Sequence, residues 1–139
     1  MINQAVHKRV SDIFGTNSIR VRPGTNAKYL SGTLLSSHMA GAPVVDEGGK
    51  YLGFISEFDV LRALRDGKNL ELLSAKDIMT THRHTINEST RIEDAVELME
   101  DKHLLNLPVE KDGVITRTIT RHDLLRAWLG VTSQLTCKS

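Results

Sequence analysis

The chain has 139 residues, 40% of them hydrophobic and 25% charged, which is the composition of an ordinary globular protein. A formal net charge of +1 and an aromatic content of 4% argue against a nucleic acid or an anionic membrane as the partner. No apolar run approaches the roughly 18 residues of a membrane span, and the polar N-terminus lacks the apolar core of a signal peptide. The one cysteine, Cys137, lies in a polar tail and cannot form an internal disulfide, so we expect a reducing cytoplasm.

The first half of the chain predicts a compact unit of alternating strands and helices. Residues 1–9 are expected to form a helical extension that packs on the rest. A short extended segment at 19–21 precedes a helix over 26–38, and strands follow at 42–46 and 51–55 around a turn that contains glycine. The second strand continues directly into an amphipathic helix through the sequence GFISEFDVLRAL.

The second half, beyond a linker at 67–75, predicts the same elements. An extended segment at 85–87 precedes a helix that Thr90 and Glu93 are expected to cap as a capping box. Strands follow at 106–110 and 114–119, and the second of them again runs into a helix, after which a flexible tail is expected at 131–139. The apolar stripe of the first of these helices consists of Ile92, Ala95, Val96 and Met99.

The two halves are copies of each other. A shift of about 65 residues, with one residue dropped from a turn, places SDIF on KDIM and the strand APVVD on NLPVE. Each half has the order β-α-β-β-α, and its three-stranded sheet has a second face that must be covered. We therefore predict an α+β fold in which two tandem β-α-β-β-α units, at 10–66 and 76–130, pack through their sheets with pseudo-twofold symmetry.

This arrangement resembles a pair of CBS domains, the tandem regulatory module named after cystathionine β-synthase. The resemblance rests on DIF and DIM at the opening of each unit, on the apolar-Pro-Val strand, and on the strand-to-helix pattern G-h-h-S/T-x-x-D. GFISEFD fits that pattern fully, and RTITRHD fits it except that Arg117 replaces the glycine. The resemblance implies clefts between the units that bind adenosyl compounds (AMP, ADP, ATP, S-adenosylmethionine or NAD) and regulate an attached or partner protein.

The two strand-to-helix junctions have two interpretations. Ser56 with Asp59, and Thr120 with Asp123, have the spacing of a capping box, in which a hydroxyl and a carboxylate accept the free N–H groups of the helix start. The same groups suit a nucleotide, because helix N–H groups attract phosphate and a carboxylate accepts from ribose hydroxyls. The residues alone favour the cap, and the resemblance favours a ligand in at least one cleft.

We expect the second cleft to hold a nucleotide that carries phosphate. Arg121 follows Thr120, whereas Glu57 follows Ser56 and would repel phosphate. Arg117 is expected either to add a second cation or to fill the space that glycine would leave open. The residues expected at this cleft are His84, Thr85, Asn106, Leu107, Pro108, Arg117, Thr120, Arg121, His122 and Asp123.

We expect the first cleft to be empty or to suit a less anionic adenosyl ligand. Backbone groups beside Pro43 and Pro108 are expected to contact the edge of the base, because proline marks an edge-like strand. The residues expected at the first cleft are Ile19, Arg20, Gly41, Ala42, Pro43, Gly53, Ser56 and Asp59.

No group of residues predicts covalent or metal-assisted chemistry, so we expect neither an enzyme nor a catalytic cofactor. His82 and His84 alternate along an extended segment, but they supply only two of the three or four ligands of a zinc site. Cys137 has no positioned histidine that would activate it. His38 and His103 are expected at the C-terminal ends of equivalent helices.

The expected function is that of a stand-alone sensor, which binds AMP, ADP or ATP and changes the activity of an effector protein. The alternatives are a sensor of S-adenosylmethionine or NAD and a scaffold that binds no ligand and acts by dimerising. We also expect a homodimer through the helix at 26–38, whose outward positions are uncharged where the second helix has acids; the alternative is that the N-terminal helix covers this face. The compared positions are Tyr29, Gly32 and Ser36 against Asp94, Glu97 and Asp101.

Overall fold

The computed structural model describes residues 9–14, 18–81 and 84–130. The first half contains a short 3-10 helix and two helices around a β-hairpin: η1 (Val10–Asp12), α1 (Ala27–Ser37), β1 (Gly41–Val45), β2 (Tyr51–Ser56) and α2 (Glu57–Arg65). The second half repeats this order after a short 3-10 helix: η2 (Leu70–Leu72), α3 (Ala75–Ile78), α4 (Ile92–Lys102), β3 (Asn106–Lys111), β4 (Val114–Thr120) and α5 (Arg121–Leu129).

Each unit is built on an antiparallel hairpin, β1 with β2 and β3 with β4. The third strand expected in each sheet is reduced to one bridging residue, Val21 beside Val44 and Ile86 beside Val109. Val21 donates its N–H to the Pro43 carbonyl at 2.9 Å and accepts from the Val45 N–H at 2.8 Å, which completes one parallel bridge. The predicted α+β class is confirmed, with two strands and a one-residue bridge in place of each three-stranded sheet.

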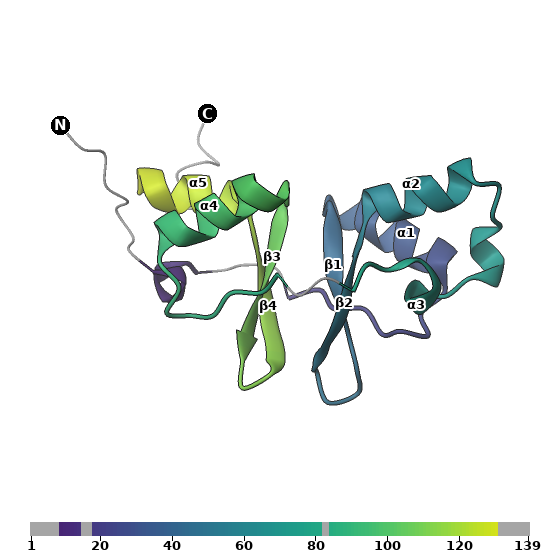
Figure 1. The fold of residues 1–139 in the computed structure, drawn as a ribbon, viewed down its shortest axis with the longest axis horizontal. Coiled ribbons are helices and arrows are strands. Elements are labelled where there is room, and N and C mark those ends of the chain that lie inside the picture. The colour runs from purple at the N-terminus through teal and green to yellow at the C-terminus, as the bar shows by residue number, and fades with distance from the viewer. Residues whose placement is uncertain (1–8, 15–17, 82–83, 131–139) are drawn as a thin grey trace.

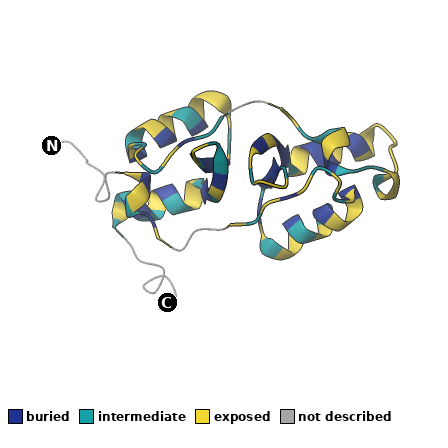
Figure 2. Cartoon of the chain, turned by 90° about the horizontal axis from the view of Figure 1, so that it is seen from below, coloured by how far each residue is buried: buried dark blue, intermediate teal, exposed yellow. Residues whose placement is uncertain are grey.

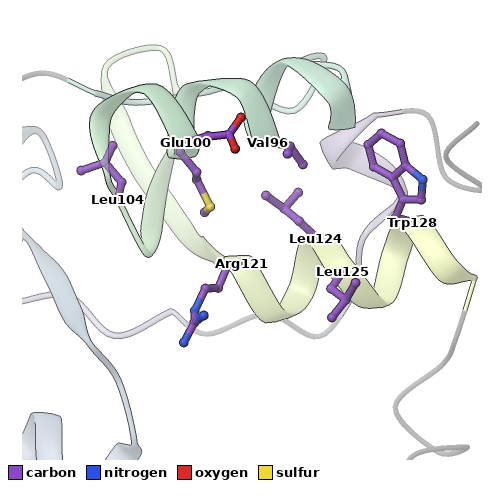
Figure 3. Close-up of a pocket in the computed structure, with 8 residues that line it drawn as sticks. Val96, Glu100, Leu104, Arg121, Leu124, Leu125 and Trp128 are labelled. Carbon is purple, nitrogen blue, oxygen red and sulfur yellow. The ribbon is translucent and has the colours of Figure 1, made fainter.

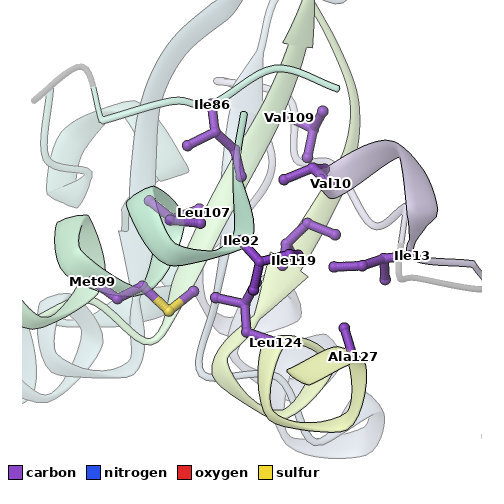
Figure 4. Close-up of a cluster of buried hydrophobic side chains, with 11 residues drawn as sticks. Val10, Ile13, Ile86, Ile92, Met99, Leu107, Val109, Ile119, Leu124 and Ala127 are labelled. Carbon is purple, nitrogen blue, oxygen red and sulfur yellow. The ribbon is translucent and has the colours of Figure 1, made fainter. Parts of the chain in front are cut away.

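The helices cover one face of each hairpin, and the two hairpins lie side by side in the middle of the molecule (Figure 1). Strand side chains alternate between faces, so Leu107, Val109 and Ile119 point to the helix side of the second hairpin. They form a buried core with Ile92 of α4 and Leu124 of α5 (Figure 4). The other face of each hairpin is left for the other unit.

The hairpins meet at the pseudo-twofold axis, as predicted. Lys50 and Val114, which are equivalent positions, form an antiparallel bridge, and Ile115 donates its N–H to the Gly49 carbonyl at 2.9 Å. A small buried cluster joins residues of both units there: Val45, Tyr51, Phe54 and Ile115. The two units therefore share a core between their sheets.

The opening segment of each unit packs on the other unit. Val10 and Ile13 lie in the core of the second unit, and Val10 donates its N–H to the Thr90 carbonyl at 2.9 Å (Figure 4). Reciprocally, Ala75 lies in the core of the first unit and donates its N–H to the Thr25 carbonyl at 2.8 Å. The segments SDIF and KDIM are therefore exchanged between the units.

One local prediction needs correction, and two others are not tested. The helical extension expected at 1–9 lies, apart from Arg9, outside the described residues, as does the tail 131–139. The capping box of Thr90 and Glu93 is wrong: α4 begins one residue later, with Arg91 at the N-cap and no side-chain cap. The Thr90 hydroxyl instead accepts the Asn87 N–H at 3.0 Å, because the preceding turn engages it.

The glycine-to-arginine difference between β2 and β4 is explained by this exchange. A Cβ at Gly53 would lie 2.6 Å from the Thr80 carbonyl oxygen, and the backbones of Phe54 and Thr80 exchange hydrogen bonds of 2.7 and 2.8 Å. At the equivalent position, the Arg117 guanidinium donates to the carbonyls of Val10 and Ile13 at 2.9 and 2.5 Å. It also pairs with Glu88 at 2.7 Å. In the second unit a side chain therefore fixes the crossing segment, whereas in the first unit backbone hydrogen bonds fix it.

We predict that Arg117→Met destabilises the protein by about 2–3 kcal/mol, because it leaves two carbonyls and a half-buried carboxylate without their charged donor. Arg9→Met is the matched control. Its guanidinium makes one exposed hydrogen bond, to the Ser89 carbonyl at 2.7 Å, and its loss is expected to cost less than about 0.5 kcal/mol. Urea unfolding followed by circular dichroism compares the two. Equal losses would contradict this role of Arg117.

Candidate functional site

Both strand-to-helix junctions are helix caps. Ser56 accepts the Asp59 N–H on its hydroxyl at 3.2 Å, and Asp59 accepts the Ser56 N–H at 2.8 Å. Thr120 and Asp123 make the equivalent pair of bonds at 3.1 and 3.0 Å. The capping-box interpretation is therefore confirmed at both junctions, and any ligand must bind to groups that already have this task.

The carboxylate of Asp59 is fully engaged and only 5% exposed. Besides the Ser56 N–H, it accepts the Ser56 hydroxyl at 3.0 Å, the Thr80 hydroxyl at 3.1 Å and the Arg62 guanidinium at 3.1 Å. A carboxylate offers about four acceptor positions, and four donors fill them here. A ribose would have to displace one of these donors to bind Asp59.

The carboxylate of Asp123 keeps acceptor capacity. Its Oδ2 accepts the Thr120 N–H, and its Oδ1 lies 3.8 Å from Arg126 Nη1, beyond hydrogen-bonding distance. Arg126 is the equivalent of Arg62, and its buried Nε has no hydrogen-bond partner among the described residues. With its side chain 14% exposed, Asp123 is the cap carboxylate that can accept from a ligand without first losing an internal donor.

A cavity of about 470 Å³ lies at the first junction and is lined from both units. This volume lies within the range of small-molecule sites. The first unit contributes the junction residues, and the second unit contributes the end of its crossing segment and the turn between α4 and β3. The lining residues are Ala40, Phe54, Ser56, Glu57, Phe58, Asp59, Arg62, Thr80, His103, Leu104, Leu105 and Asn106.

Of the residues expected at the first cleft, Ser56 and Asp59 line this cavity. Gly41 pairs with Ser56 across the hairpin, whereas Ala42 is buried in the core of the first unit. Three others are not among the lining residues: Ile19 packs against that core, Arg20 donates to the Ile115 carbonyl at 3.0 Å, and Gly53 adjoins Thr80.

Of the residues expected at the second cleft, Asn106 lies at the second junction, where it pairs with Thr120 across the hairpin, and it also lines the cavity of the first junction. Leu107 and Arg117 do not gather at Asp123. Leu107 is fully buried in the core of the second unit. Arg117 shares the helix-side face of β4 with Ile119, opposite to Thr118 and Thr120, so it does not supply the second cation of a phosphate site.

The backbone beside the two prolines is also occupied. The carbonyls of Pro43 and Pro108 accept the N–H groups of Val21 and Ile86 at 2.9 and 3.0 Å. Each of these carbonyls therefore already has one partner, and the expected contact of a base edge with the neighbouring backbone groups stays a prediction.

The segment before Ile86 is turned toward the hairpin. The Thr85 hydroxyl donates to the Glu110 carboxylate at 2.9 Å, and Thr85 lines a polar hollow with Glu88 and Glu110. His84 precedes it and is half-buried. The structure therefore does not bring Thr85 to the start of α5.

The start of α5 contributes Thr120, Arg121, His122 and Asp123 to the second junction. Arg121 and His122 are exposed, and among the described residues no carboxylate pairs with the Arg121 guanidinium. Glu57 occupies the equivalent position at the start of α2. The predicted charge difference between the two helix starts is therefore present on the surface.

Sequence reasoning missed Thr80 and Arg62 as partners of Asp59, and His103 as part of the cavity lining. Arg62 lies three residues after Asp59 on a helix, a spacing that could have suggested the ion pair. Thr80 could not be found from spacing, because its contact depends on the exchange of opening segments. His38 and His103 occupy the C-caps of α1 and α4 in left-handed conformations, with φ of 56° and 55°, which confirms their predicted positions.

Over residues 9–14, 18–81 and 84–130, every helix falls short of the length and apolar character that crossing a membrane requires. The same ranges contain no group of three or more His, Cys, Asp or Glu side chains placed to hold a metal ion. His82 lies outside these ranges.

Comparison with known proteins gives the same architecture. The uncharacterized protein MK0525 of Methanopyrus kandleri is 28% identical over 119 residues, which are 84% of this chain and 61% of that protein. The CBS-domain containing protein ATU1752 from Agrobacterium tumefaciens has the same fold, with a TM-score of 0.78 at 23% identity over 91% of this chain and 98% of its own. Three of the curated relatives are longer, and the chain spans 61%, 25% and 43% of their lengths.

A third relative has been crystallised with a ligand. CBSX2, a CBS domain-containing protein of Arabidopsis thaliana, was solved in complex with AMP and superposes with a TM-score of 0.76 at 26% identity, over 89% of this chain and 98% of that one. A model of the CBS domain matches this chain twice, at residues 10–66 and 75–130. Since these two matches cover most of the sequence and coincide with its two repeated units, the protein belongs to the CBS domain family and is a tandem pair of CBS domains.

Proposed function

We propose that this chain is a sensor of an adenosyl nucleotide, AMP, ADP or ATP, which it binds between its two units at the start of α5. The observation that carries the proposal is the difference between the two cap carboxylates. Asp123 keeps an oxygen that can accept from a ligand, whereas Asp59 is saturated by Ser56, Thr80 and Arg62.

The first turn of α5 has the groups that a nucleotide requires. Asp123 would accept from the ribose hydroxyls, and the Thr120 hydroxyl and the His122 N–H would donate to phosphate. The N–H groups of Arg121 and Asp123 already donate to the Leu105 carbonyl and the Thr120 hydroxyl. Arg121 can add a charge-assisted fork to the phosphate oxygens, since no carboxylate among the described residues holds it. The AMP complex of CBSX2 supports the choice of an adenosyl ligand.

A ligand bound at the start of α5 and touching both units would change the relative orientation of the units. The two units already touch, because their sheets share the cluster of Val45, Tyr51, Phe54 and Ile115. A ligand that touches both units favours one of their relative orientations over others. A partner protein that distinguishes these orientations would then respond to the nucleotide, which is regulation rather than catalysis.

One observation favours a second candidate ligand, which would bind at the first junction. Glu57 lines that cavity beside Asp59, and a carboxylate there disfavours phosphate but suits a cationic adenosyl compound such as S-adenosylmethionine. The saturated state of Asp59 weighs against this candidate, because ribose hydroxyls would have to replace Thr80 or Arg62. If the protein is instead a scaffold that binds no ligand, neither junction binds an adenosyl compound.

We predict that AMP, ADP or ATP raises the melting temperature of the protein. A ligand that binds only the folded state adds about 2.7 kcal/mol at about a hundredfold excess over its Kd, which corresponds to several degrees. Thermal-shift measurements against AMP, ADP, ATP, S-adenosylmethionine and NAD compare the candidates directly. A shift with S-adenosylmethionine alone would favour the first-junction ligand, and no shift at millimolar concentrations would favour the scaffold.

We predict that Asp123→Ala weakens nucleotide binding by about 10- to 150-fold, because the ribose hydroxyls lose their charged acceptor. Asp59→Ala is the matched control at the equivalent position and is expected to change the affinity far less. Isothermal titration calorimetry of AMP and ATP into both variants measures the difference. Loss of binding in Asp59→Ala with intact binding in Asp123→Ala would contradict the proposed site.

Both variants remove a helix cap, so their stability must be measured first. We expect Asp123→Ala to cost about 1 kcal/mol, the usual value of a cap. Asp59→Ala should cost more, about 2–4 kcal/mol, because it also leaves the Thr80 hydroxyl and the Arg62 guanidinium without their acceptor. Urea unfolding checks this order, and equal costs would show that the additional donors to Asp59 add nothing.

A further inference from the structure

Few polar side chains are buried in the described part of this protein. Exposed residues follow the outer faces of both helix pairs, while the buried ones face the hairpins (Figure 2). Among the described residues, the buried polar or charged side chains belong to Asp59, Asn106 and Thr118. A buried polar group costs free energy unless it is hydrogen-bonded, so each of the three should have a partner.

Two of these three side chains have no hydrogen-bond partner among the described residues. Four donors saturate Asp59, whereas the Thr118 hydroxyl is sealed from solvent without any partner. The side-chain amide of Asn106 also makes no hydrogen bond there, although the residue is only 5% exposed. This amide is not sealed, because Asn106 lines the cavity of about 470 Å³ at the first junction.

The side chain of Asn106 points toward the first unit. Leu107 lies in the helix-side core of the second unit, and side chains alternate along a strand. Asn106 therefore points away from that core, to the face of the hairpin that the first unit covers. Thr118 lies diagonally across the hairpin from Asn106 and points to the same face. The amide thus enters the cavity from the second unit, while the first unit supplies Ser56 and Asp59.

The first unit indicates that the fold does not require this amide. Gly41 is the residue equivalent to Asn106, and Phe54 is equivalent to Thr118. A Cβ at Gly41 would lie 2.5 Å from Cε2 of Phe54, so the ring of Phe54 covers the start of β1. Apolar atoms of the first unit therefore occupy the face on which the second unit has two unpaired polar groups. A polar group that costs stability without serving the fold points to a ligand.

The other walls of the cavity are largely apolar and include two aromatic rings. Phe54 contributes from β2, Phe58 from the first turn of α2, and Leu105 from the turn before β3. Phe58 is 73% exposed and Leu105 is 46% exposed, so apolar surface stays open to solvent beside the amide. An apolar cavity with a few placed polar groups is the usual form of a small-molecule site.

The groove between α4 and α5 lacks this combination. It has a volume of about 530 Å³ and shares Leu104 with the junction cavity. Val96 and Leu124 face each other in it, and Arg121 points away from them (Figure 3). No buried polar side chain is among its described lining residues, so the groove has no group that would select a ligand.

The groups around Asn106 limit the chemistry of the ligand. A ribose is disfavoured, because Asp59 would have to release Thr80 or Arg62 to accept its hydroxyls. A phosphate is disfavoured by the Glu57 carboxylate in the lining. The Asn106 carboxamide places an N–H donor beside a carbonyl acceptor, and this pair of groups binds the edge of a base. The aromatic walls suit the face of a flat ring.

We propose that the cavity at the first junction binds a free nucleobase, with neither ribose nor phosphate, and that Asn106 selects it. The carboxamide pairs with the edge of the base, and the ring of the base lies against Phe54 and Phe58. This site goes beyond the nucleotide site at the start of α5 and does not depend on it. The protein would then respond to a base and to a nucleotide at separate junctions.

Asn106→Leu tests whether the amide serves a ligand rather than the fold. Leucine has the same branched outline as asparagine, and the amide has no internal partner to lose. We therefore expect the variant to melt at or above the wild-type temperature in circular dichroism. Asn106→Val, which is smaller and suits a strand, is the second variant. A melting temperature clearly below that of the wild type in both variants would overturn the assignment of the amide to a ligand.

Binding is measured by titrating the ¹⁵N-labelled full chain with adenine, hypoxanthine, uracil and cytosine and following the amide chemical shifts. We expect saturable shifts at Phe54, Glu57 and Phe58 with at least one base, and an affinity at least about 10-fold lower in Asn106→Leu. Thr118→Val is the matched control, because it removes the other unpaired polar group of the same face, which is sealed from any ligand. It should leave the affinity for the base unchanged. AMP in the same experiment reports on the start of α5, so failure of one site is distinguishable from failure of the other.

Three results would overturn the proposal. The first is the absence of saturable shifts at this junction with all four bases at millimolar concentration. The second is a base affinity in Asn106→Leu equal to that of the wild type. The third is tighter binding of adenosine than of adenine at this junction, because it would show that Asp59 gives up an internal donor to accept a ribose.

Discussion

The packing of each opening segment on the opposite unit determines the rest of the structure. Val10 and Ile13 complete the core of the second unit, and Ala75 completes that of the first. Neither hairpin with its two helices has a full core without the segment that belongs in sequence to its neighbour. Because a sheet of two strands buries little surface by itself, the two units are expected to fold and unfold together.

This exchange also connects the cap carboxylates to the chain segments that cross between the units. Thr80 ends one crossing segment, where its backbone pairs with Phe54 and its hydroxyl donates to Asp59. At the other unit, Arg117 holds the crossing segment from the helix side of β4, and Asp123 is left with an unfilled oxygen. A ligand at Asp123 would therefore meet a carboxylate that holds no crossing segment. A ligand at Asp59 would instead compete with Thr80 of a crossing segment for the carboxylate.

The sequence predicted the parts of the fold that depend on local pattern. The hairpins, the amphipathic helices and the capping boxes at Ser56 and Thr120 follow from alternation, periodicity and spacing within a few residues, and the duplication supported each of them twice. The cap at Thr90 failed because a local turn with Asn87 engaged the same hydroxyl. Contacts between distant segments could not be predicted: a repeat shows that two units are equivalent, but it does not show which unit an opening segment joins.

The candidate site, like the fold, could be predicted from the sequence only in part. The charge contrast between Glu57 and Arg121 is visible in the sequence, and the structure places both at helix starts. The places of Arg117 and Leu107 depend on the face of the sheet, and the structure puts both on the helix side, away from Asp123. Because side chains alternate along a strand, a residue in a binding motif can point to the opposite face of the sheet from its neighbours.

The most direct test of nucleotide binding at the start of α5 is a titration of the ¹⁵N-labelled full chain with AMP, followed by amide chemical shifts. We predict that the amides of Arg121, His122 and Asp123 shift in a saturable way, since they lie at the helix start that would receive the ligand. The amides of Glu57, Phe58 and Asp59 should shift far less. Saturable shifts confined to Glu57–Asp59, with those of Arg121–Asp123 unchanged, would contradict it.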